Sequence, residues 1–390
     1  MTIQEDPAPE PAAHDIPRTP PRPVVQTLRQ EVGFLCPIPN CGNPYLTWHH
    51  FSPPWRIEHH HRTQDMIALC LEHARKADVG AFTEAQLREF KRNGARQTQE
   101  IRGRFDWMRR DLLVIVGGNF YYQQEGPILQ LGDKPCIWLR RDSDGYLLTN
   151  FWLPTASREP RARLEDNWWI VPPDVAQDIE SPPHGRLVHV KYPNGDELRI
   201  EFFDIESLDE LDQRYPWCST KPWSDITEPM VGVEIWERAA DTDIEFGPRE
   251  TRVGNHTVTR TLFARSAGAA IAAPWPPGIG GPMYQDQELR LSDLVTHHSP
   301  VIEGGRFVRC RLIGPAVLLP LGTNFYRCGL GGPPDQVFWE RTQDRRQPGG
   351  AIVTKACLFE DCTFVEVGYA LTTDEIEVWK KSTADVATTD

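Results

Sequence analysis

The 38 residues from Cys36 to His73 contain three cysteines and six histidines, a density found nowhere else in this chain of 390 residues. The segments that carry them read CPIPNC, LTWHH, IEHHH and MIALCLEH. Thiolates and imidazoles are the side chains that bind structural zinc. The stretch therefore predicts a small metal-stabilised domain, because ligands from several turns of the chain must meet at one ion.

Two pairs of residues within this stretch have the spacing of zinc ligands. Cys36 and Cys41 flank a turn that contains two prolines, and Cys70 precedes His73 by three positions. Together the two pairs predict one tetrahedral Cys3His site for a structural Zn²⁺. The alternative interpretation is three buried thiols and a histidine on the surface.

A short β-type run between the two pairs ends in the adjacent histidines His49 and His50. The prolines of the following FSPPW predict an open loop. Neighbouring side chains on a strand point to opposite faces. One histidine can therefore bind a metal while the other addresses a substrate.

The order of these motifs resembles the HNH endonucleases, which have the ββα-metal fold, in their zinc-containing subgroup. The motifs are the cysteine turn, Leu-x-x-His-His, a proline loop and Met-Ile-Ala-Leu-Cys-x-x-His, within residues 25–95. The resemblance implies that His49 binds a catalytic Mg²⁺ or Mn²⁺ and that His50 is the general base that activates water. The middle Asn of the family motif falls near Asp65, which can bind the cation or hold the imidazole. Three neighbouring histidines can also take that role: His59, His60 and His61.

Ala74 departs from the family pattern, which continues Leu-Cys-x-x-His-His and uses the second histidine as a ligand of the catalytic metal. Three explanations stay open: the natural protein has lost this metal, Asp78 one turn later replaces the ligand, or the chain carries an introduced His-to-Ala change. The well-kept surroundings favour the third, which makes the chain inactive as written. A fourth explanation is that His73 serves the catalytic metal and the zinc site is incomplete.

The formal net charge of −13 is distributed unevenly along the chain. Residues 20–112 carry a net charge of +4, whereas residues 113–390 carry −14. The histidine-rich part therefore has the positive potential that favours phosphate binding, and the acidic remainder repels nucleic acid. Five basic residues are expected to contact DNA, although a solvated helix face explains them equally well: Arg75, Lys76, Arg88, Lys91 and Arg92.

Beyond residue 112 the chain alternates short β-type runs with DG, NG and PP turn signals, which predicts hairpins. The turn at Asn194 and Gly195 is the clearest of them. Near the C-terminus the pattern Phe-x-x-Cys recurs at 307–310, 325–328 and 359–362, as stacked parallel β-coils require. Four cysteines of this region are therefore expected to be packed thiols rather than metal ligands: Cys310, Cys328, Cys357 and Cys362.

The predicted fold class is α+β, with a small N-terminal ββα-metal, zinc-stapled HNH domain followed by a large β-rich body that ends in a β-helix-like repeat. The chain has no apolar run long enough to span a bilayer and no apolar leader, which favours a cytoplasmic protein without membrane contact. The predicted domains are a disordered proline-rich arm (1–24), the HNH domain (25–95), a basic linker helix (96–112), a β-rich domain (113–289), a β-helix-like domain (290–380) and a disordered tail (381–390).

The predicted activity is divalent-metal-dependent hydrolysis of DNA phosphodiester bonds. The β-rich body is then a regulatory or oligomerisation platform that binds a second copy or a protein partner. A bacterial anti-phage role fits this arrangement by analogy. The alternatives are a non-catalytic zinc-stapled module that binds DNA or protein, and the nuclease subunit of a two-protein, nucleic-acid-guided defence system.

Overall fold

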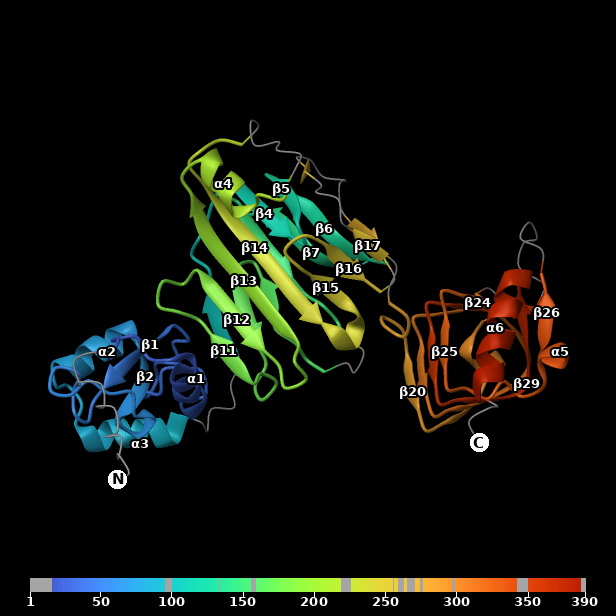
Figure 1. Ribbon diagram of the computed structural model, residues 1–390, viewed down its shortest axis with the longest axis horizontal. Coiled ribbons are helices and arrows are strands. Elements are labelled where there is room, and N and C mark those ends of the chain that lie inside the picture. Colours follow the sequence, from blue (N-terminus) through green and yellow to red (C-terminus); the bar gives the residue numbers. More distant parts are fainter. Residues whose placement is uncertain are drawn as a thin grey trace, which may run out of the picture.

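The computed structural model describes residues 16–386 except 95–99, 133, 156–158, 219–225, 255, 259–262, 265–270, 274–275, 297–298 and 342–349. Three units follow one another along the chain (Figure 1): the head (16–94), the sandwich (100–273) and the coil domain (276–386). Each has its own cluster of buried apolar side chains. Among the described residues, no helix is both long and apolar enough to cross a bilayer.

The head is a two-stranded antiparallel sheet surrounded by helices. Its elements are α1 (Arg22–Glu31), β1 (Leu46–His50), the short 3₁₀ helix η1 (Thr63–Asp65), β2 (Met66–Cys70), α2 (Leu71–Asp78) and α3 (Glu84–Gly94). β2 is buried along its whole length, which accounts for its uninterrupted apolar sequence, MIALC. β1 and β2 pair so that His49 lies opposite Ile67 and His50 opposite Met66.

The predicted linker helix over 96–112 is wrong in its described part. Residues 101–104 form strand β3 (Ile101–Arg104), in which buried Ile101 and Gly103 alternate with more exposed arginines. This period of two is that of a strand at a sheet edge. Gly103 is needed there because a Cβ atom would lie 2.3 Å from the ring of Trp169 on the neighbouring strand.

The two predicted disordered ends are also partly wrong. α1 begins at Arg22, inside the predicted arm, because Pro23 fits the first helical turn, where its missing N–H is not needed. At the other end, α6 (Thr373–Val386) continues six residues into the predicted tail. Residues 1–15 and 387–390 lie outside the described part of the chain.

The sandwich consists of two sheets with one core between them. Phe151 and Trp169 of one sheet and Phe202 and Val233 of the other belong to this core. The first sheet has the order β19 (Ile271–Ala273), β6 (Gly126–Leu131), β7 (Lys134–Arg141), β8 (Leu147–Phe151), β9 (Arg163–Glu165), β10 (Trp168–Val171) and β3.

The second sheet of the sandwich runs from β11 to β17 in sequence order, and β4, β5 and β18 join it beside β14. The predicted hairpin at Asn194 and Gly195 is confirmed, because β12 and β13 pair antiparallel with Lys191 opposite Glu197. The strands of this second sheet are β4 (Leu112–Val116), β5 (Asn119–Tyr122), β11 (Asp178–Glu180), β12 (Leu187–Lys191), β13 (Glu197–Ile205), β14 (Met230–Ala239), β15 (Ile244–Phe246), β16 (Thr251–Val253), β17 (His256–Val258) and β18 (Phe263–Ala264), with α4 (Leu208–Arg214) and η3 (Ala240–Thr242) in the connections.

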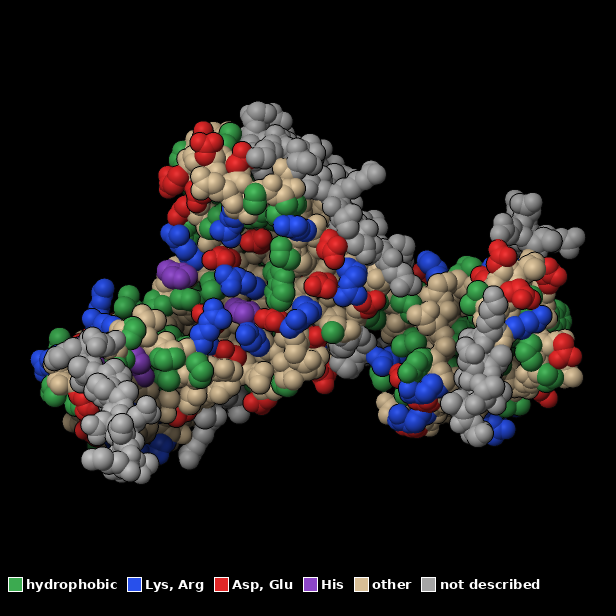
Figure 2. Space-filling model, viewed as in Figure 1, with side chains coloured by type: hydrophobic (Ala, Val, Ile, Leu, Met, Phe, Trp, Pro, Cys, Tyr) green, Lys and Arg blue, Asp and Glu red, His purple; other side chains and the backbone are tan. Residues whose placement is uncertain are grey.

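The outer face of this second sheet carries charges of both signs side by side (Figure 2). Ion pairs cross from strand to strand, for example Arg238 with Glu197 at 2.7 Å and Arg214 with Glu234 at 3.1 Å. The face is therefore charge-balanced, and it offers no uniformly positive surface for a nucleic-acid backbone.

The head is fixed to the sandwich by a buried ion pair. Arg29 of α1 donates from Nε to Asp178 Oδ1 at 2.9 Å and from Nη2 to Oδ2 at 2.6 Å. Both side chains are almost fully buried. The backbone N–H of Leu46 also donates to the carbonyl of Ser181 at 3.1 Å. The strand that carries the paired histidines is thus held by the edge of the sandwich.

The coil domain consists of two sheets in which the strands of the described residues pair in parallel, and α6 lies across it (Figure 1). One sheet has the order β20 (Met283–Gln285), β23 (Arg306–Val308), β28 (Leu358–Glu360) and β25 (Asn324–Tyr326). The other contains β21 (Glu288–Arg290), β22 (Val301–Glu303), β24 (Arg311–Leu321), β26 (Phe338–Glu340), β27 (Ala351–Lys355) and β29 (Thr363–Leu371), with η4 (Leu291–Leu294) and α5 (Pro334–Val337) between strands.

Aromatic rings stack through the coil domain in an order that differs from the order of the chain. Phe359 stacks on Phe307 with ring centroids 4.6 Å apart and on Phe325 at 5.0 Å. The Phe-x-x-Cys pattern therefore does mark stacked positions, but Phe307 and Phe325 lie on opposite sides of Phe359. The 18 positions from Phe307 to Phe325 are therefore not one step of the stack, because Phe359 lies between the two rings. The order of the rings follows from strand pairing, because β28 lies between β23 and β25. Spacing in the sequence alone does not predict this order.

The four cysteines of the coil domain are packed thiols, as predicted. Cys310, Cys357 and Cys362 are buried, and Cys328 is partly exposed. Their sulfurs lie against backbone carbonyls, with Cys362 Sγ 3.3 Å from the Phe307 oxygen and Cys328 Sγ 3.4 Å from that of Phe359.

Candidate metal centre and adjoining pocket

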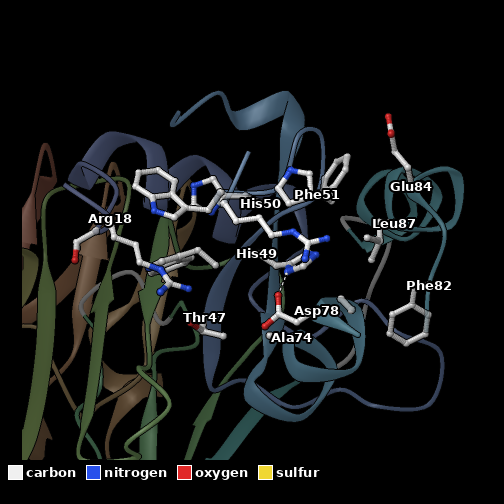
Figure 3. Close-up of a pocket in the computed structure, with 16 residues that line it drawn as sticks. Arg18, Thr47, His49, His50, Phe51, Ala74, Asp78, Phe82, Glu84 and Leu87 are labelled. Atoms are coloured by element: carbon white, nitrogen blue, oxygen red, sulfur yellow. Dashed lines mark ion pairs between the residues drawn. The ribbon is translucent and has the colours of Figure 1, made fainter. Parts of the chain in front are cut away.

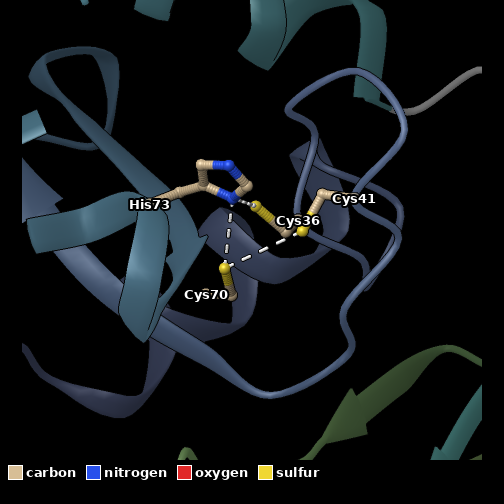
Figure 4. Close-up of side chains that lie close together, drawn as sticks. All are labelled: Cys36, Cys41, Cys70 and His73. Carbon is tan, nitrogen blue, oxygen red and sulfur yellow. Dashed lines mark hydrogen bonds between the residues drawn. The ribbon is translucent and has the colours of Figure 1, made fainter. Parts of the chain in front are cut away.

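Three thiols and one imidazole converge in the head at the four positions expected from the sequence (Figure 4). Cys41 Sγ lies 3.8 Å from Cys70 Sγ, and His73 Nδ1 lies 3.2 Å from Cys70 Sγ and 3.4 Å from Cys36 Sγ. A tetrahedral zinc ion with Zn–S bonds of about 2.3 Å separates its sulfur ligands by about 3.8 Å. The four residues therefore lie close enough to bind one metal ion, with a geometry compatible with structural zinc.

The fold explains how the two ligand pairs meet. Cys36 and Cys41 belong to the loop between α1 and β1, whereas Cys70 ends β2 and precedes the first turn of α2, which contains His73. Burial raises the pKa of the Cys36 and Cys41 thiols, because the charged thiolate loses its hydration. A divalent cation offsets that cost, so this donor set suits a metal better than a group of free thiols.

His73 lies in this cluster and does not line the pocket that contains His49 and His50. Its position therefore does not fit the explanation in which it serves a catalytic metal. The second site of the head is a pocket of about 640 Å³ between β1 and α2 (Figure 3). Both His49 and His50 line it.

His49 and Asp78 form a pair within the pocket. His49 Nδ1 lies 3.0 Å from Asp78 Oδ1, the contact that is dashed in Figure 3. Burial lowers the pKa of His49, although the Asp78 carboxylate opposes this shift. A neutral imidazole and a carboxylate can both be ligands of a divalent cation. With only these two protein ligands, the cation would have coordination positions left for water and phosphate.

His50 has a different environment in the same pocket. Its ring lies 4.8 Å from Trp55 and 5.2 Å from His60, centroid to centroid. Burial, followed by the charge of His60, lowers the pKa of His50 to about 4, so the imidazole is neutral near pH 7. Within the described part of the chain, its buried Nε2 has no hydrogen-bond partner. The nitrogen is therefore a hydrogen-bond acceptor that no described residue engages, although almost none of its surface is exposed.

Ala74 also lines this pocket, one helical turn before Asp78 on the same side of α2. A histidine at position 74 would extend from that helix toward the pocket. Asp78 already occupies the compensating position that the sequence suggested, next to His49. Among the described residues, however, the only group of three or more His, Cys, Asp and Glu ligand atoms close together is the Cys3His cluster. The pocket thus supplies two protein donors for a cation and not three.

Asp65, the expected substitute for the middle Asn, is not among the residues that line the pocket. Its carboxylate receives hydrogen bonds from Arg62 Nε at 2.9 Å and Arg88 Nη2 at 3.0 Å. Burial acts to raise the pKa of Asp65, but these two arginines together outweigh it and lower the pKa below its ordinary value. Of the other candidates, His60 and His61 lie beside the His50 ring, whereas His59 stacks on Trp55.

Three of the five predicted DNA-contacting residues are engaged within the head. Lys76 pairs with Glu72, Arg88 pairs with Asp65 and Glu84, and Lys91 pairs with Glu31. The other two, Arg75 and Arg92, are exposed.

Two arginines that the sequence interpretation overlooked line the pocket instead: Arg18 and Arg56. Arg56 follows the histidine pair by only six positions, which was a usable signal. Arg18 belongs to a proline-rich segment that no local pattern connects to the site.

No protein-family model matches the chain, and neither a curated protein nor a solved structure matches it. The functional interpretation therefore rests on the residues of the head and on their geometry.

Proposed function

We propose that the head is an HNH-type ββα-metal domain that hydrolyses phosphodiester bonds of DNA with the help of a divalent cation. One observation carries the proposal: an imidazole nitrogen without a partner, on His50, shares a pocket with the His49 and Asp78 pair. The Cys3His cluster at the start of α2 supports it, because that framework joins α2 to the loop that leads into β1.

Each residue has a distinct role in this proposal. His50 Nε2 accepts the proton of the attacking water, which turns the water into a nucleophile. His49 and Asp78 hold Mg²⁺ or Mn²⁺, which when bound stabilises charge on the phosphate and the leaving oxygen. Trp55, beside the His50 ring, restricts the orientation of the imidazole. The Cys3His cluster has no chemical role beyond holding the fold.

Ala74 reduces the activity expected of the chain. With two protein donors the cation is held weakly, so we expect little or no cleavage by the chain as it stands. Ala74→His should add a third donor from the same face of α2 and raise the rate of cleavage.

The test is nicking of supercoiled plasmid DNA in Mg²⁺ or Mn²⁺ by four proteins: the chain itself, Ala74→His, Ala74→His with His50→Asn, and Ala74→His with His184→Asn. His184 is an exposed histidine of the sandwich and serves as the matched control. We expect Ala74→His and the His184 control to nick equally, and His50→Asn to lower the rate by roughly 100-fold or more. No nicking by Ala74→His in either metal, with zinc content and fold intact, would contradict the proposal.

A non-catalytic zinc-stapled module is the second candidate function. The presence of only two protein donors in the pocket favours it. In that case the head binds nucleic acid or protein and cuts nothing, even after Ala74→His. Binding of DNA without nicking in the assay above would select this function.

We also propose that the coil domain is a β-helix-like platform for regulation or oligomerisation. Parallel pairing throughout its strands and the stack of aromatic rings support a solenoid-like arrangement. Positive φ angles at Ala356, Asp361 and Glu366, spaced by five residues, mark regular corners between short straight sides. Size-exclusion chromatography with light scattering tests the oligomer, since a monomer at all concentrations would contradict that part of the proposal.

A further inference from the structure

Two positive side chains that line the pocket, Arg18 and Arg56, have no carboxylate partner within the part of the chain that the structure describes. Most basic side chains near them are paired. Arg62 contacts Glu58 and Asp65, Arg88 contacts Glu84 and Asp65, and Arg29 contacts Asp178. The head therefore neutralises its structural arginines and leaves two exposed guanidinium groups at the mouth of the pocket.

The carboxylates that line the pocket form no ion pair with these two arginines. Asp78 is 3.0 Å from His49, and Glu84 is 2.9 Å from Arg88. These are the two acidic residues among those that line the pocket. An anion that enters the pocket thus meets two guanidinium groups whose charge is not already engaged by a carboxylate there.

The position of Arg18 is set by the chain segment before α1. His61 Nε2 lies 2.8 Å from the carbonyl oxygen of Pro17, the residue that precedes Arg18. With the proton on Nε2, His61 donates to this carbonyl and holds the segment beside the His50 ring. Figure 3 shows the Arg18 side chain extending from this segment into the pocket. His61 is therefore a positioning residue for Arg18.

We propose that Arg18 and Arg56, called here the arginine pair, bind backbone phosphates of a nucleic acid in the pocket that His50 lines. The inference rests on the proposed function for the identity of the reaction, and it adds the part of the substrate that is recognised. A guanidinium presents a planar set of donors that fits a phosphate in bidentate fashion. Contacts with the phosphate backbone do not read the bases, so binding at this pocket is independent of nucleotide sequence. Because the contacts are between charges, binding weakens as the salt concentration rises.

The test measures binding without cleavage. Fluorescence anisotropy of the full chain, in buffer without Mg²⁺, Mn²⁺ or chelator, is recorded with labelled duplex DNA and, separately, duplex RNA of the same sequence, at several salt concentrations. The variants are Arg18→Gln, Arg56→Gln, their combination, and the corresponding lysine substitutions. Arg290→Gln, an exposed arginine of the coil domain, is the matched control. Zinc content confirms that each head is folded.

We expect the double glutamine variant to lose at least tenfold in affinity at about 0.1 M salt and to lower the slope of log affinity against log salt by about 2. Lysine at both positions should restore part of the affinity and the full slope, because the charge returns without the bidentate geometry. Arg290→Gln should match the unchanged chain. The RNA arm decides whether the pair accepts both backbones or DNA alone.

His61→Gln should weaken binding only while Arg18 is present, so it should have no further effect in the Arg18→Gln background. An additive loss would overturn the positioning role.

Failure of this inference is distinguishable from failure of the proposed function. Unchanged affinity and salt slope in the double glutamine variant overturn the arginine pair, even if Ala74→His nicks plasmid. Loss of binding in that variant supports the pair even if no protein nicks. No binding of either duplex by the unchanged chain at about 0.05 M salt also overturns it.

Discussion

The head and the coil domain use cysteine in opposite ways. In the head, Cys36, Cys41 and Cys70 gather with His73 so that four ligand atoms lie within 4.8 Å of one another. In the coil domain, cysteines such as Cys362 pack with their sulfurs against carbonyl oxygens of neighbouring strands.

The difference follows from how much apolar surface each unit can bury. The head has one short buried strand, β2, and a small core, whereas the coil domain stacks aromatic rings through several parallel strands. A domain of this small size commonly needs a metal or a disulfide to be stable. In this chain cysteines gather at a candidate metal site where the core is small, and they fill space in the core where it is large.

Loss of the zinc ligands should have the largest effect on stability. Cys70→Ser removes one of three thiolates, and metal binding by such sites contributes on the order of 10 kcal/mol to folding. We expect residues 22–94 to lose protection in hydrogen exchange and bound zinc to fall to zero by elemental analysis. A Cys70→Ser protein with a protected head would show that the cluster is not what stabilises this unit.

Breaking the buried pair between the head and the sandwich should have the next largest effect. Arg29→Ala leaves Asp178 buried without a partner, which costs about 3–5 kcal/mol. Denaturant unfolding of the full chain measures the loss. Arg311→Ala, which removes an exposed pair with Glu288, is the control and should cost no more than about 1 kcal/mol. Equal losses in both variants would mean that the head is not held by this contact.

A packed thiol of the coil domain should matter less than a zinc ligand. Cys362→Ala deletes one buried sulfur, and we expect about 1–2 kcal/mol of destabilisation from the small cavity. Bound zinc should stay unchanged, which separates this variant from Cys70→Ser. If zinc fell in Cys362→Ala, the contrast between the two kinds of cysteine would fail.

The smallest expected effect is the change in stability of the sandwich with pH, which depends on His189. Burial lowers the pKa of His189, and the positive charge of Lys191 lowers it further. The hydrogen bond to Glu197 acts in the opposite direction but does not outweigh burial. Glu180 also faces the ring, at 3.9 Å. Because the folded pKa lies below the ordinary value of 6.5, the unfolded chain binds more protons as pH falls. The stability of the sandwich is therefore complete above about pH 6.5 and declines below it.

His189→Gln should flatten this decline, as measured by thermal unfolding at a series of pH values. His184→Gln, which changes an exposed histidine of the same unit, should leave the pH dependence unchanged. A decline of equal slope in the His189 variant would assign the effect to other groups.

Features of the head that depend on close neighbours in the sequence could be predicted, and features that depend on distant partners could not. The zinc ligands and the histidine pair are marked by spacing, and the structure brings the four ligands together as expected. Asp65 looked suitable for the pocket, but Arg88, 23 positions later, holds it elsewhere. Arg18 reaches the pocket because His61 holds the neighbouring carbonyl, a contact across 44 positions.

The same limit applies to the rest of the fold. Hairpins such as the one at Asn194 follow from turn residues, whereas the stacking order of Phe307, Phe359 and Phe325 depends on which distant strands pair. The arginines near 102–104 suggested a solvated helix. Their alternation with Ile101 and Gly103 has the period of a strand. The contact of Gly103 with the ring of Trp169, which lies on a distant strand, explains why this segment forms a strand and not a helix.

The cleavage and the phosphate contacts proposed for the pocket both depend on the zinc framework of the head. The most direct test of that framework is an anomalous difference map from crystals of the full chain, purified without chelator and measured on both sides of the zinc absorption edge. We predict one strong peak, about 2.3 Å from the sulfurs of Cys36, Cys41 and Cys70 and about 2.0–2.1 Å from His73 Nδ1, with none beside Cys310, Cys328, Cys357 or Cys362. The absence of a peak at the first cluster, or a peak of equal height at the second, would contradict the account.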